Sequence, residues 1–471
     1  MIDHEASGLE PPDPSLIAGL HEWNSSPSLL DVAPASWGPL AGQLFVAEWG
    51  DLAPPTNPLR DQPVGYQITR VDPDSGRVVP FVRNARPGPA SAQGAQGQGL
   101  ERPFDAKFGP DGALYIVDYG IARINPALAP PYEFPPGTGA IWRVTGQAEA
   151  AEVVRLEAGT NVDAAVAYSQ QAFPFGTDRA LVARDDLFAD SLTSGSLQGL
   201  DAGSPLLLTD PGGLSQATAD ELERLDVSRV TILGGTEAVS IQVETQLRDL
   251  GYEVDRVSGS TRIDTAIAIA LSEPALASST SAIVARAGFA GDPTQAFADS
   301  LAAGAASANA GGVPILLTDT DALSSQTRDY LSASQIEMVV IKGGPDAVSE
   351  RTQEEIEGLG IATMREAGAT RAGTAVEVAR IAFGYETVDQ APGVILVDGY
   401  QSESWASGFP AAALAGQTGY PVLLSNGAAL PPETADYLGG AEGGGTVALV
   451  CGPFTDAAAC DQAAALLGLA E

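Results

Sequence analysis

The chain has 471 residues, 44% of them hydrophobic, which is enough for two to four domains with their own cores. Its 60 acidic residues outnumber 24 basic ones and give a formal net charge of −36. This charge argues against nucleic acid or an anionic bilayer as a partner, because both are negatively charged. No apolar run reaches the roughly 18 residues that span a bilayer, so we expect no membrane insertion.

The amino-terminal segment "MIDHEASGLEPPDPSL" is acidic and rich in proline. It has neither the basic start nor the apolar centre of a signal peptide. Taken literally, this segment predicts a cytoplasmic protein.

Residues 1–150 predict an all-β domain, because short apolar runs alternate with turns rich in Pro, Gly and Asp. "LFVAEWG" at 44–50 and "LYIVDYG" at 114–120 look like two cycles of one unit, 70 residues apart. Such cycles are typical of propeller blades, so we expect a partial β-propeller of about two blades. Residues 85–99, between the cycles, predict a flexible loop.

From about residue 155 onward the sequence repeats itself three times, with spacings between 101 and 109 residues. "VTILGGTEAVS" at 230–240 returns as "VVIKGGPDAVS" at 339–349 and more loosely as "VALVCGPFTDA" at 447–457. In each copy short apolar runs alternate with helical patterns, which favours a mainly parallel sheet covered by helices. The prediction is three tandem α/β domains, at residues 151–255, 256–364 and 365–471.

The recurrent motifs fall at the carboxyl ends of the predicted strands, where parallel sheets bind ligands and helix amino termini meet. "TRIDT" and "TRAGT" place Arg262 and Arg371 at helix starts. A guanidinium group is suited to phosphate or carboxylate. The structural alternative stays open, in which Arg262 forms a salt bridge with Asp264 or with a neighbouring repeat.

Other polar and proline residues recur on the same edge. For Thr265 and Thr374 helix capping is favoured over ligand binding, and the repeated "PILL" runs belong mostly to the core. Asp190 and Asp299 are expected to cap helices. The candidate ligand-binding residues are Arg256, Arg262, Thr265, Arg365, Arg371, Thr374, Pro205, Thr209, Pro314, Thr318, Pro421 and Ser425.

Groups for catalysis are scarce. The two histidines, His4 and His21, lie outside the repeats, and no P-loop, nucleophile elbow or spaced cysteine set occurs. We therefore predict a binding protein with no catalytic residue and no cofactor, and we assign no metal site. Cys451 and Cys460, nine residues apart, allow either a local disulfide or two buried thiols.

At these motifs the chain resembles the type-2 cell-wall-binding repeat family, over about two-thirds of its length. The similar motifs are an R-x-x-G turn, an R-x-x-T-A helix start, a "PILLT" strand and a G-G strand end: Arg256–Gly259, Arg262–Ala266, Pro314–Thr318 and Gly343–Gly344. The resemblance implies a three-lobed assembly with pseudo-threefold symmetry. It also implies noncovalent binding to an anionic cell-wall polysaccharide, through the "PILL" edge and the arginines, that anchors a bacterial surface protein.

The copies depart from this pattern in places. The first has Asn161 and Ala164 where the second has Arg262 and Thr265, and Cys451 takes the place of a glycine in the third. At most two of three equivalent sites are therefore expected to be fully equipped. Because the chain is so acidic, we expect bridging divalent cations to help it hold an anionic polymer.

Residues 1–150 resemble the closing blades of soluble quinoprotein glucose/sorbosone dehydrogenases. The similarity lies in "LFVAEWG", "GYQITRVDPDSGRVVPFV", "RPFDAKFGPDGALYIVDYG" and "GAIWRV". A closed ring needs at least four blades, so the resemblance implies that the sequence begins inside a longer gene product. The cytoplasmic inference then fails, and the expected location is the cell surface.

Three functions follow, of which a noncovalent cell-wall anchor leads. The alternative is the carboxyl-terminal part of a secreted quinone-dependent sugar dehydrogenase, with the repeats as its anchor. A third hypothesis is a surface-layer or assembly scaffold, in which the repeats associate with one another rather than with the wall.

Overall fold

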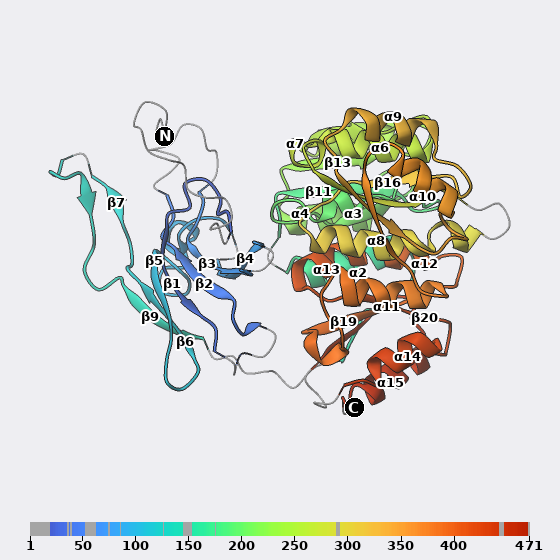
Figure 1. Cartoon of the computed structure of the whole chain (residues 1–471). Coiled ribbons are helices and arrows are strands. Elements are labelled where there is room, and N and C mark those ends of the chain that lie inside the picture. Colours follow the sequence, from blue (N-terminus) through green and yellow to red (C-terminus); the bar gives the residue numbers. More distant parts are fainter. Residues whose placement is uncertain are drawn as a thin grey trace. The chain divides into compact units, whose positions relative to one another are not determined.

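The computed structural model of the chain contains two compact units, Met1–Ala148 and Glu149–Glu471, which are described separately (Figure 1). The acidic, proline-rich amino-terminal segment and His4 lie outside the described residues. The structure describes residues 19–34, 37, 40–51, 63–73, 76–84, 86–125, 127–144, 153–174, 176–288, 293–441 and 447–469.

The described part of the first unit is built from antiparallel sheets, as its sequence predicts. A four-stranded sheet has the order β1-β2-β3-β4, a three-stranded sheet the order β5-β6-β9, and β7 pairs with β8. The strands are β1 (Pro27–Val32), β2 (Leu44–Glu48), β3 (Gln67–Val71), β4 (Val78–Arg83), β5 (Pro103–Phe108), β6 (Leu114–Asp118), β7 (Arg123–Ile124), β8 (Tyr132–Glu133) and β9 (Ala140–Val144).

The two larger sheets share one core. The ring of Trp37 lies 5.3 Å from that of Phe45 and 4.8 Å from that of Phe108, both edge to face, so aromatic packing joins strands of both sheets. The pairing of sheets through a common core agrees with two adjacent blades. A propeller as such stays a prediction.

The segment predicted as a flexible loop is instead tied to its surroundings. It contains a short 3₁₀ helix, η3 (Ala90–Gln93). Asn84 accepts a hydrogen bond from the Leu100 N–H at 2.8 Å and donates to the carbonyls of Leu100 and Gly88 at 2.7 and 2.8 Å. The two bonds to Leu100 span 16 residues, and a composition rich in Gly, Ala and Gln does not reveal them.

The second unit contains three four-stranded sheets, and every strand pair in them is parallel among the described residues. The predicted mainly parallel α/β architecture is therefore confirmed. The sheets are β12 (Leu206–Thr209), β11 (Arg179–Arg184), β13 (Arg229–Leu233) and β14 (Glu253–Val257); β16 (Ile315–Thr318), β15 (Ser281–Arg286), β17 (Met338–Lys342) and β18 (Ala362–Glu366); and β20 (Val422–Ser425), β19 (Gly393–Asp398), β21 (Ala448–Cys451) and β10 (Val153–Arg155).

The third sheet takes its edge strand from the beginning of the repeat region. β10 pairs with β21, although nearly 300 residues separate them in the chain, and Arg155 lies opposite Cys451. We define lobe 1 as residues 161–257, lobe 2 as residues 262–366, and lobe 3 as residues 371–469 together with 153–155. The predicted divisions at residues 151, 256 and 365 follow the sequence repeat and stay a prediction as domain boundaries.

Helices cover the sheets and also fill the centre between the lobes (Figure 1). The first helix of each lobe packs on an edge strand of its own sheet: α2 on β12, α6 on β16 and α11 on β20. The helices are α2 (Asn161–Ala172), α3 (Gly195–Gln198), α4 (Gln216–Leu225) and α5 (Ile241–Asp249); α6 (Arg262–Ser272), α7 (Pro274–Ala277), α8 (Ala298–Asn309), α9 (Ser325–Ala333) and α10 (Glu350–Glu357); and α11 (Arg371–Ile381), α12 (Ser404–Gly408), α13 (Ala411–Thr418), α14 (Pro432–Leu438) and α15 (Ala457–Leu466).

One equivalent helix from each lobe, α3, α8 and α13, meets the other two at the centre of the unit. Small residues allow this approach: a Cβ added at Gly195 would lie 2.4 Å from the Cα of Gly304. The small-residue composition that the copies share at these positions is therefore a packing requirement between lobes.

The third lobe also carries a disulfide, between Cys451 and Cys460, which decides between the two alternatives for these cysteines. The strand register corrects the alignment that put Cys451 at a glycine position. Arg155 faces Cys451, just as Arg256 faces Ile232 and Arg365 faces Ile341. Cys451 therefore takes the place of a buried isoleucine.

Candidate functional site

The amino terminus of α6 lies where lobe 1 meets lobe 2. Thr261 caps the helix by accepting a hydrogen bond from the Asp264 N–H. Arg262, the first helical residue, donates to the carbonyl of Ala287, just after β15, at 2.9 Å. Its guanidinium also lies 5.4 Å from the ring centre of Phe188 in lobe 1. Arg262 thus bridges two repeats, and its partner is a backbone carbonyl rather than Asp264.

The amino terminus of α11 repeats this arrangement between lobes 2 and 3. Arg371 donates to the carbonyl of Gly399, just after β19, at 2.6 Å. It also donates to the Thr294 hydroxyl of lobe 2 at 3.1 Å, and its guanidinium lies 4.7 Å from the ring centre of Tyr400. The helix start, the strand end and the preceding lobe therefore converge on one cation.

At the third junction, between lobes 3 and 1, a neutral side chain takes the place of the arginine. Asn161, the first residue of α2, donates to the carbonyl of Asp185, just after β11, at 2.9 Å. The same amide group donates to the Glu403 carboxylate of lobe 3 at 3.0 Å. The backbone target is equivalent at all three junctions, whereas the charge differs.

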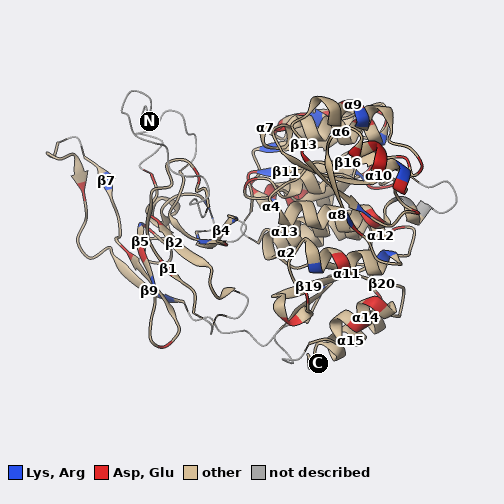
Figure 2. Cartoon of the chain, in the orientation of Figure 1, with Lys and Arg blue, Asp and Glu red and all other residues tan. Residues whose placement is uncertain are grey.

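Both arginines are half-buried and remain open to solvent on one side. Burial lowers the pKa of the Arg262 guanidinium from its ordinary value, and the nearby carboxylate of Asp190 opposes this shift. A guanidinium stays protonated at neutral pH, so two local positive charges stand on an acidic protein. In Figure 2 the basic residues of the repeats are scattered short segments rather than a continuous patch.

Beside each arginine lies a threonine–aspartate pair that sequence reasoning had assigned to helix capping; Thr265, Thr374 and Asp299 are buried and Asp190 is partly buried. Thr265 donates to Asp190 at 3.0 Å, and Thr374 makes the equivalent hydrogen bond to Asp299. Burial raises the pKa of the Asp299 carboxyl to about 6, although Arg286 and Arg371 act in the opposite direction. The two aspartates therefore join adjacent lobes rather than cap their own helices.

These pairs explain the glycine that ends β13 and β17. A Cβ at Gly234 would lie 2.6 Å from a carboxylate oxygen of Asp190, and one at Gly343 equally close to Asp299. Both glycines also have a positive φ, at 105° and 95°, which other residues rarely adopt. The first glycine of each G-G motif is therefore required by the packing of a carboxylate from its own lobe, the same carboxylate that accepts from the next lobe's threonine.

Arg256 and Arg365, which are also partly buried, brace the loops of their own lobes. Arg256 donates to the carbonyls of Gly234 and Val239 and pairs with Glu244 at 2.8 Å. Arg365 donates to the carbonyl of Gly343 and to the side chain of Gln353. All these hydrogen bonds go to groups of the same lobe, so the observed role of the two arginines is to hold the strand ends in place.

The remaining candidate residues are buried. Thr209 and Thr318 accept hydrogen bonds from the N–H groups of Ser215 and Ser324, and so close the turn after each strand. A polymer cannot reach these side chains without a rearrangement of the loops. The buried candidates are Pro205, Thr209, Pro314, Thr318, Pro421, Ser425, Thr265 and Thr374.

Lobe 2 holds a buried ion pair that the sequence did not reveal. Lys342, at the end of β17, contacts Glu366 at the end of β18, and their side chains are 1% and 2% exposed. Burial lowers the pKa of the Lys342 ammonium from its ordinary value, while Glu366 raises it. Only the strand register, which places the two residues side by side, identifies this pair.

Two features are missing from the described part of the chain. It contains no group of three or more His, Cys, Asp and Glu side chains placed to hold a metal ion. Within the same residues no helix is long and apolar enough to cross a membrane.

Comparison with known families identifies the repeats. Residues 155–244, 256–353 and 365–460, together more than half of the chain, match the family described as "Cell wall binding domain 2 (CWB2)". N-acetylmuramoyl-L-alanine amidase LytC of Bacillus subtilis (strain 168) is 28% identical over 204 residues, which are 43% of this chain and 38% of LytC. The chain thus spans well under half the length of this curated relative.

Two solved structures have a similar fold. Cwp6 from Clostridium difficile matches with a TM-score of 0.61 and 16% identity, over 91% of this chain and 66% of that one. Cwp8 from Clostridium difficile matches with a TM-score of 0.57 and 19% identity, over 78% of this chain and 60% of that one. The repeats therefore fold as in these proteins, and cell-wall binding is the function of their family.

Proposed function

Because this chain belongs to the cell wall binding domain 2 family, we propose that its three lobes hold an anionic wall polysaccharide at the lobe junctions. The binding groups are Arg262 and Arg371, each at the start of a helix whose dipole adds a partial positive charge. Phosphate or carboxylate groups of the polymer are the expected partners. The protein is then anchored noncovalently at the cell surface.

One observation carries this proposal. Asn161 makes the same hydrogen bond to the strand-end carbonyl as Arg262 and Arg371 do. The fold therefore needs a donor at this position but not a cation. The architecture therefore does not require the positive charge that two of the three junctions carry, and this supports a role for the charge in binding an anionic ligand.

The overall charge of −36 opposes an anionic polymer at long range. We infer that divalent cations reduce this repulsion by bridging polymer and protein carboxylates. Such a bridge needs ligands from both partners, since no complete metal cluster lies within the described residues. If wall binding is unchanged by a chelator and by low salt, this part of the proposal is wrong.

We further infer that the first unit is a partial propeller that the repeats attach to the wall. The support is its two packed antiparallel sheets, the first with four strands. A sugar dehydrogenase activity is kept only as the alternative, because nothing in the described residues favours it.

The proposal is tested by sedimentation of the full chain with isolated cell walls. The variant R262N/R371N converts both junctions to the natural chemistry of the third, so each strand-end hydrogen bond can be kept while two charges are lost. We expect its affinity for the wall to fall about 10-fold or more. R351N is the matched control, because Arg351 is 74% exposed, on α10, and pairs with Glu355.

Equal retention of R262N/R371N and the parent chain would discard the junction site. Loss of binding in R351N to the same degree would mean that only total charge matters. If the parent chain itself does not sediment with walls but forms larger assemblies, the scaffold hypothesis replaces wall binding.

A further inference from the structure

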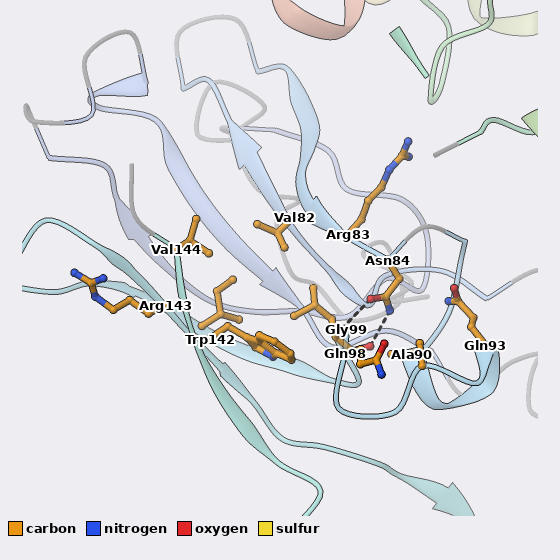
Figure 3. A pocket seen from close by; sticks show the side chains of 13 residues that line it. Val82, Arg83, Asn84, Ala90, Gln93, Gln98, Gly99, Trp142, Arg143 and Val144 are labelled. Carbon is orange, nitrogen blue, oxygen red and sulfur yellow. Dashed lines mark hydrogen bonds between the residues drawn. The ribbon is translucent and has the colours of Figure 1, made fainter. Parts of the chain in front are cut away.

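The first unit contains a pocket of about 350 Å³ that the wall-binding proposal does not use. It lies where β4, β6 and β9 meet the segment 84–100 (Figure 3). Leu100, Ile116 and Ala90, all at most 4% exposed, supply buried apolar surface, and Trp142 adds an aromatic face. A pocket of this size is at the lower end of those that hold small ligands.

The wall of the pocket is held in place by hydrogen bonds from side chains, of which Glu101 is buried. Asn84 joins the two ends of the 84–100 segment through three hydrogen bonds, as described above. Glu101 accepts hydrogen bonds from the N–H and the hydroxyl of Ser91 at 2.8 and 2.7 Å. Gln93 donates to the carbonyl of Gly88 at 3.0 Å. A ligand would therefore meet a wall that is already shaped, which lowers the entropy cost of binding.

Trp142 is fixed in orientation. Its indole N–H donates to the Asp118 carboxylate at 3.3 Å. The same carboxylate accepts the N–H groups of Glu101 and Arg102 at 2.7 and 2.8 Å. The edge of the indole is thereby anchored to β6, and its flat face remains for the pocket.

The polar rim limits what the pocket can hold. Gln98 is exposed and offers both a donor and an acceptor. The described residues that line the pocket include no carboxylate, in a chain whose charged residues are mostly acidic. Arg83 and Arg143 extend away from the centre of the pocket (Figure 3), and Arg143 pairs with Asp111 at 2.8 Å. A neutral or an acidic ligand would therefore meet no carboxylate in the lining.

We propose that this pocket binds one or two pyranose rings of a neutral or acidic glycan, stacked on Trp142 and hydrogen-bonded to Gln98. A pyranose has a face of C–H groups that matches a flat aromatic surface and a rim of hydroxyls that matches an amide. The inference goes beyond the wall-binding proposal, because the pocket lies within the first unit and shares no residue with the repeats. The first unit would thereby make its own contact with a glycan.

The test is titration of the full chain with N-acetylglucosamine and, separately, with glucuronic acid, followed by the indole N–H resonances. In the parent chain we expect a saturable shift of the Trp142 signal, which W142F assigns. Saturation by either sugar supports the site, and the ratio of the two affinities tells whether a carboxylate is preferred.

Two variants probe the pocket in different ways. W142A removes the stacking surface, and A95F fills the pocket from its wall without removing a hydrogen-bonded side chain. We expect both to weaken sugar binding about 10-fold or more. W23A is the control, since Trp23 is 60% exposed, in the same unit, and outside the pocket. R262N/R371N should bind the sugars as the parent does, which keeps this test separate from wall binding.

The absence of a saturable Trp142 shift with either sugar in the parent chain would overturn the proposal. So would unchanged sugar binding in a folded A95F. Binding of the apolar probe 8-anilinonaphthalene-1-sulfonate that neither sugar displaces would assign the pocket to an apolar ligand instead.

Discussion

Lobes 1 and 2 have the same strand order and register, yet one cross-strand pair of residues is apolar in lobe 1 and charged in lobe 2. In lobe 1 Leu233 lies opposite Val257 at the ends of β13 and β14. In lobe 2 the same positions hold Lys342 and Glu366, which form an ion pair. The difference teaches that the parallel strands and the helices around them determine the fold of a lobe. The two residues of this cross-strand pair can be apolar or charged, provided that they match each other.

The largest effect is expected from breaking this pair on one side. K342L leaves the Glu366 carboxylate buried without its partner, which should cost about 3 to 5 kcal/mol of unfolding free energy. K342L/E366V instead recreates the pair of lobe 1 and should be as stable as the parent or more stable. Urea unfolding, followed by circular dichroism, measures both.

The double variant is the control for the single one, because both remove the ammonium group. If K342L and K342L/E366V lose the same free energy, the lobes do not tolerate exchange of their interior pairs. The comparison between lobes 1 and 2 would then fail.

The disulfide distinguishes lobe 3 from the other two. Cys451 stands where lobes 1 and 2 have Ile232 and Ile341, and it closes a loop of nine residues with Cys460 on α15. Loop-closure entropy predicts a loss of about 2.5 kcal/mol when the bond is removed. C451I/C460A restores the isoleucine of the other lobes, and its urea midpoint in the absence of reductant measures the loss.

Dithiothreitol should lower the unfolding midpoint of the parent chain but leave that of C451I/C460A unchanged. A reductant effect on both proteins would show that the measured loss does not come from this disulfide.

Much of the architecture follows from the sequence, but the contacts between lobes do not. Alternating apolar runs and helical patterns suffice to predict parallel sheets, because burial on both faces leaves a local signature. No local pattern tells that Val154 joins the sheet of lobe 3, since a short apolar run fits any edge strand. The same holds for Asp190 and Asp299, whose neighbours in space belong to the next repeat.

The candidate site follows from the sequence only in part, for the same reason. Arg262 and Arg371 were predicted because an arginine at a helix start has a recognisable motif; the structure places both at lobe junctions, and their binding role stays a proposal. Thr209 and Thr318 carry equally regular motifs, yet their hydroxyl groups close turns inside the fold. A repeated motif indicates that a position matters, and only burial separates packing from binding.

A pH-dependent effect is expected from Asp299. Its pKa in the folded protein is about 6, above the value of about 3.9 for an unfolded chain. The folded state therefore binds the proton more tightly, and this group's contribution to stability is present at low pH and lost as pH rises through about 6. Between pH 7 and pH 4 the parent should gain about 2 kcal/mol relative to D299N.

The difference between the parent and D299N isolates this carboxyl from the many other acids of the chain. Urea midpoints at several pH values between 4 and 7 measure it. A constant difference across this range would mean that Asp299 does not titrate there, because water reaches its carboxylate between the lobes.

The smallest effect concerns the junction that lacks a cation. N161R gives the third junction the residue of the other two, with the Asp185 carbonyl within reach of the same kind of hydrogen bond. Glu403, which now accepts from Asn161, would pair with the new guanidinium and withhold part of its charge. We expect affinity for the wall polymer to rise about threefold in N161R and further in N161R/E403Q, because charges at the rim of an interface chiefly change the association rate.

Sedimentation at several salt concentrations measures the affinity of both variants, and the gain should shrink as salt screens the charges. If N161R binds no better than the parent while R262N/R371N binds worse, the three junctions do not share one polymer-binding role, and the first repeat serves only to close the ring of lobes.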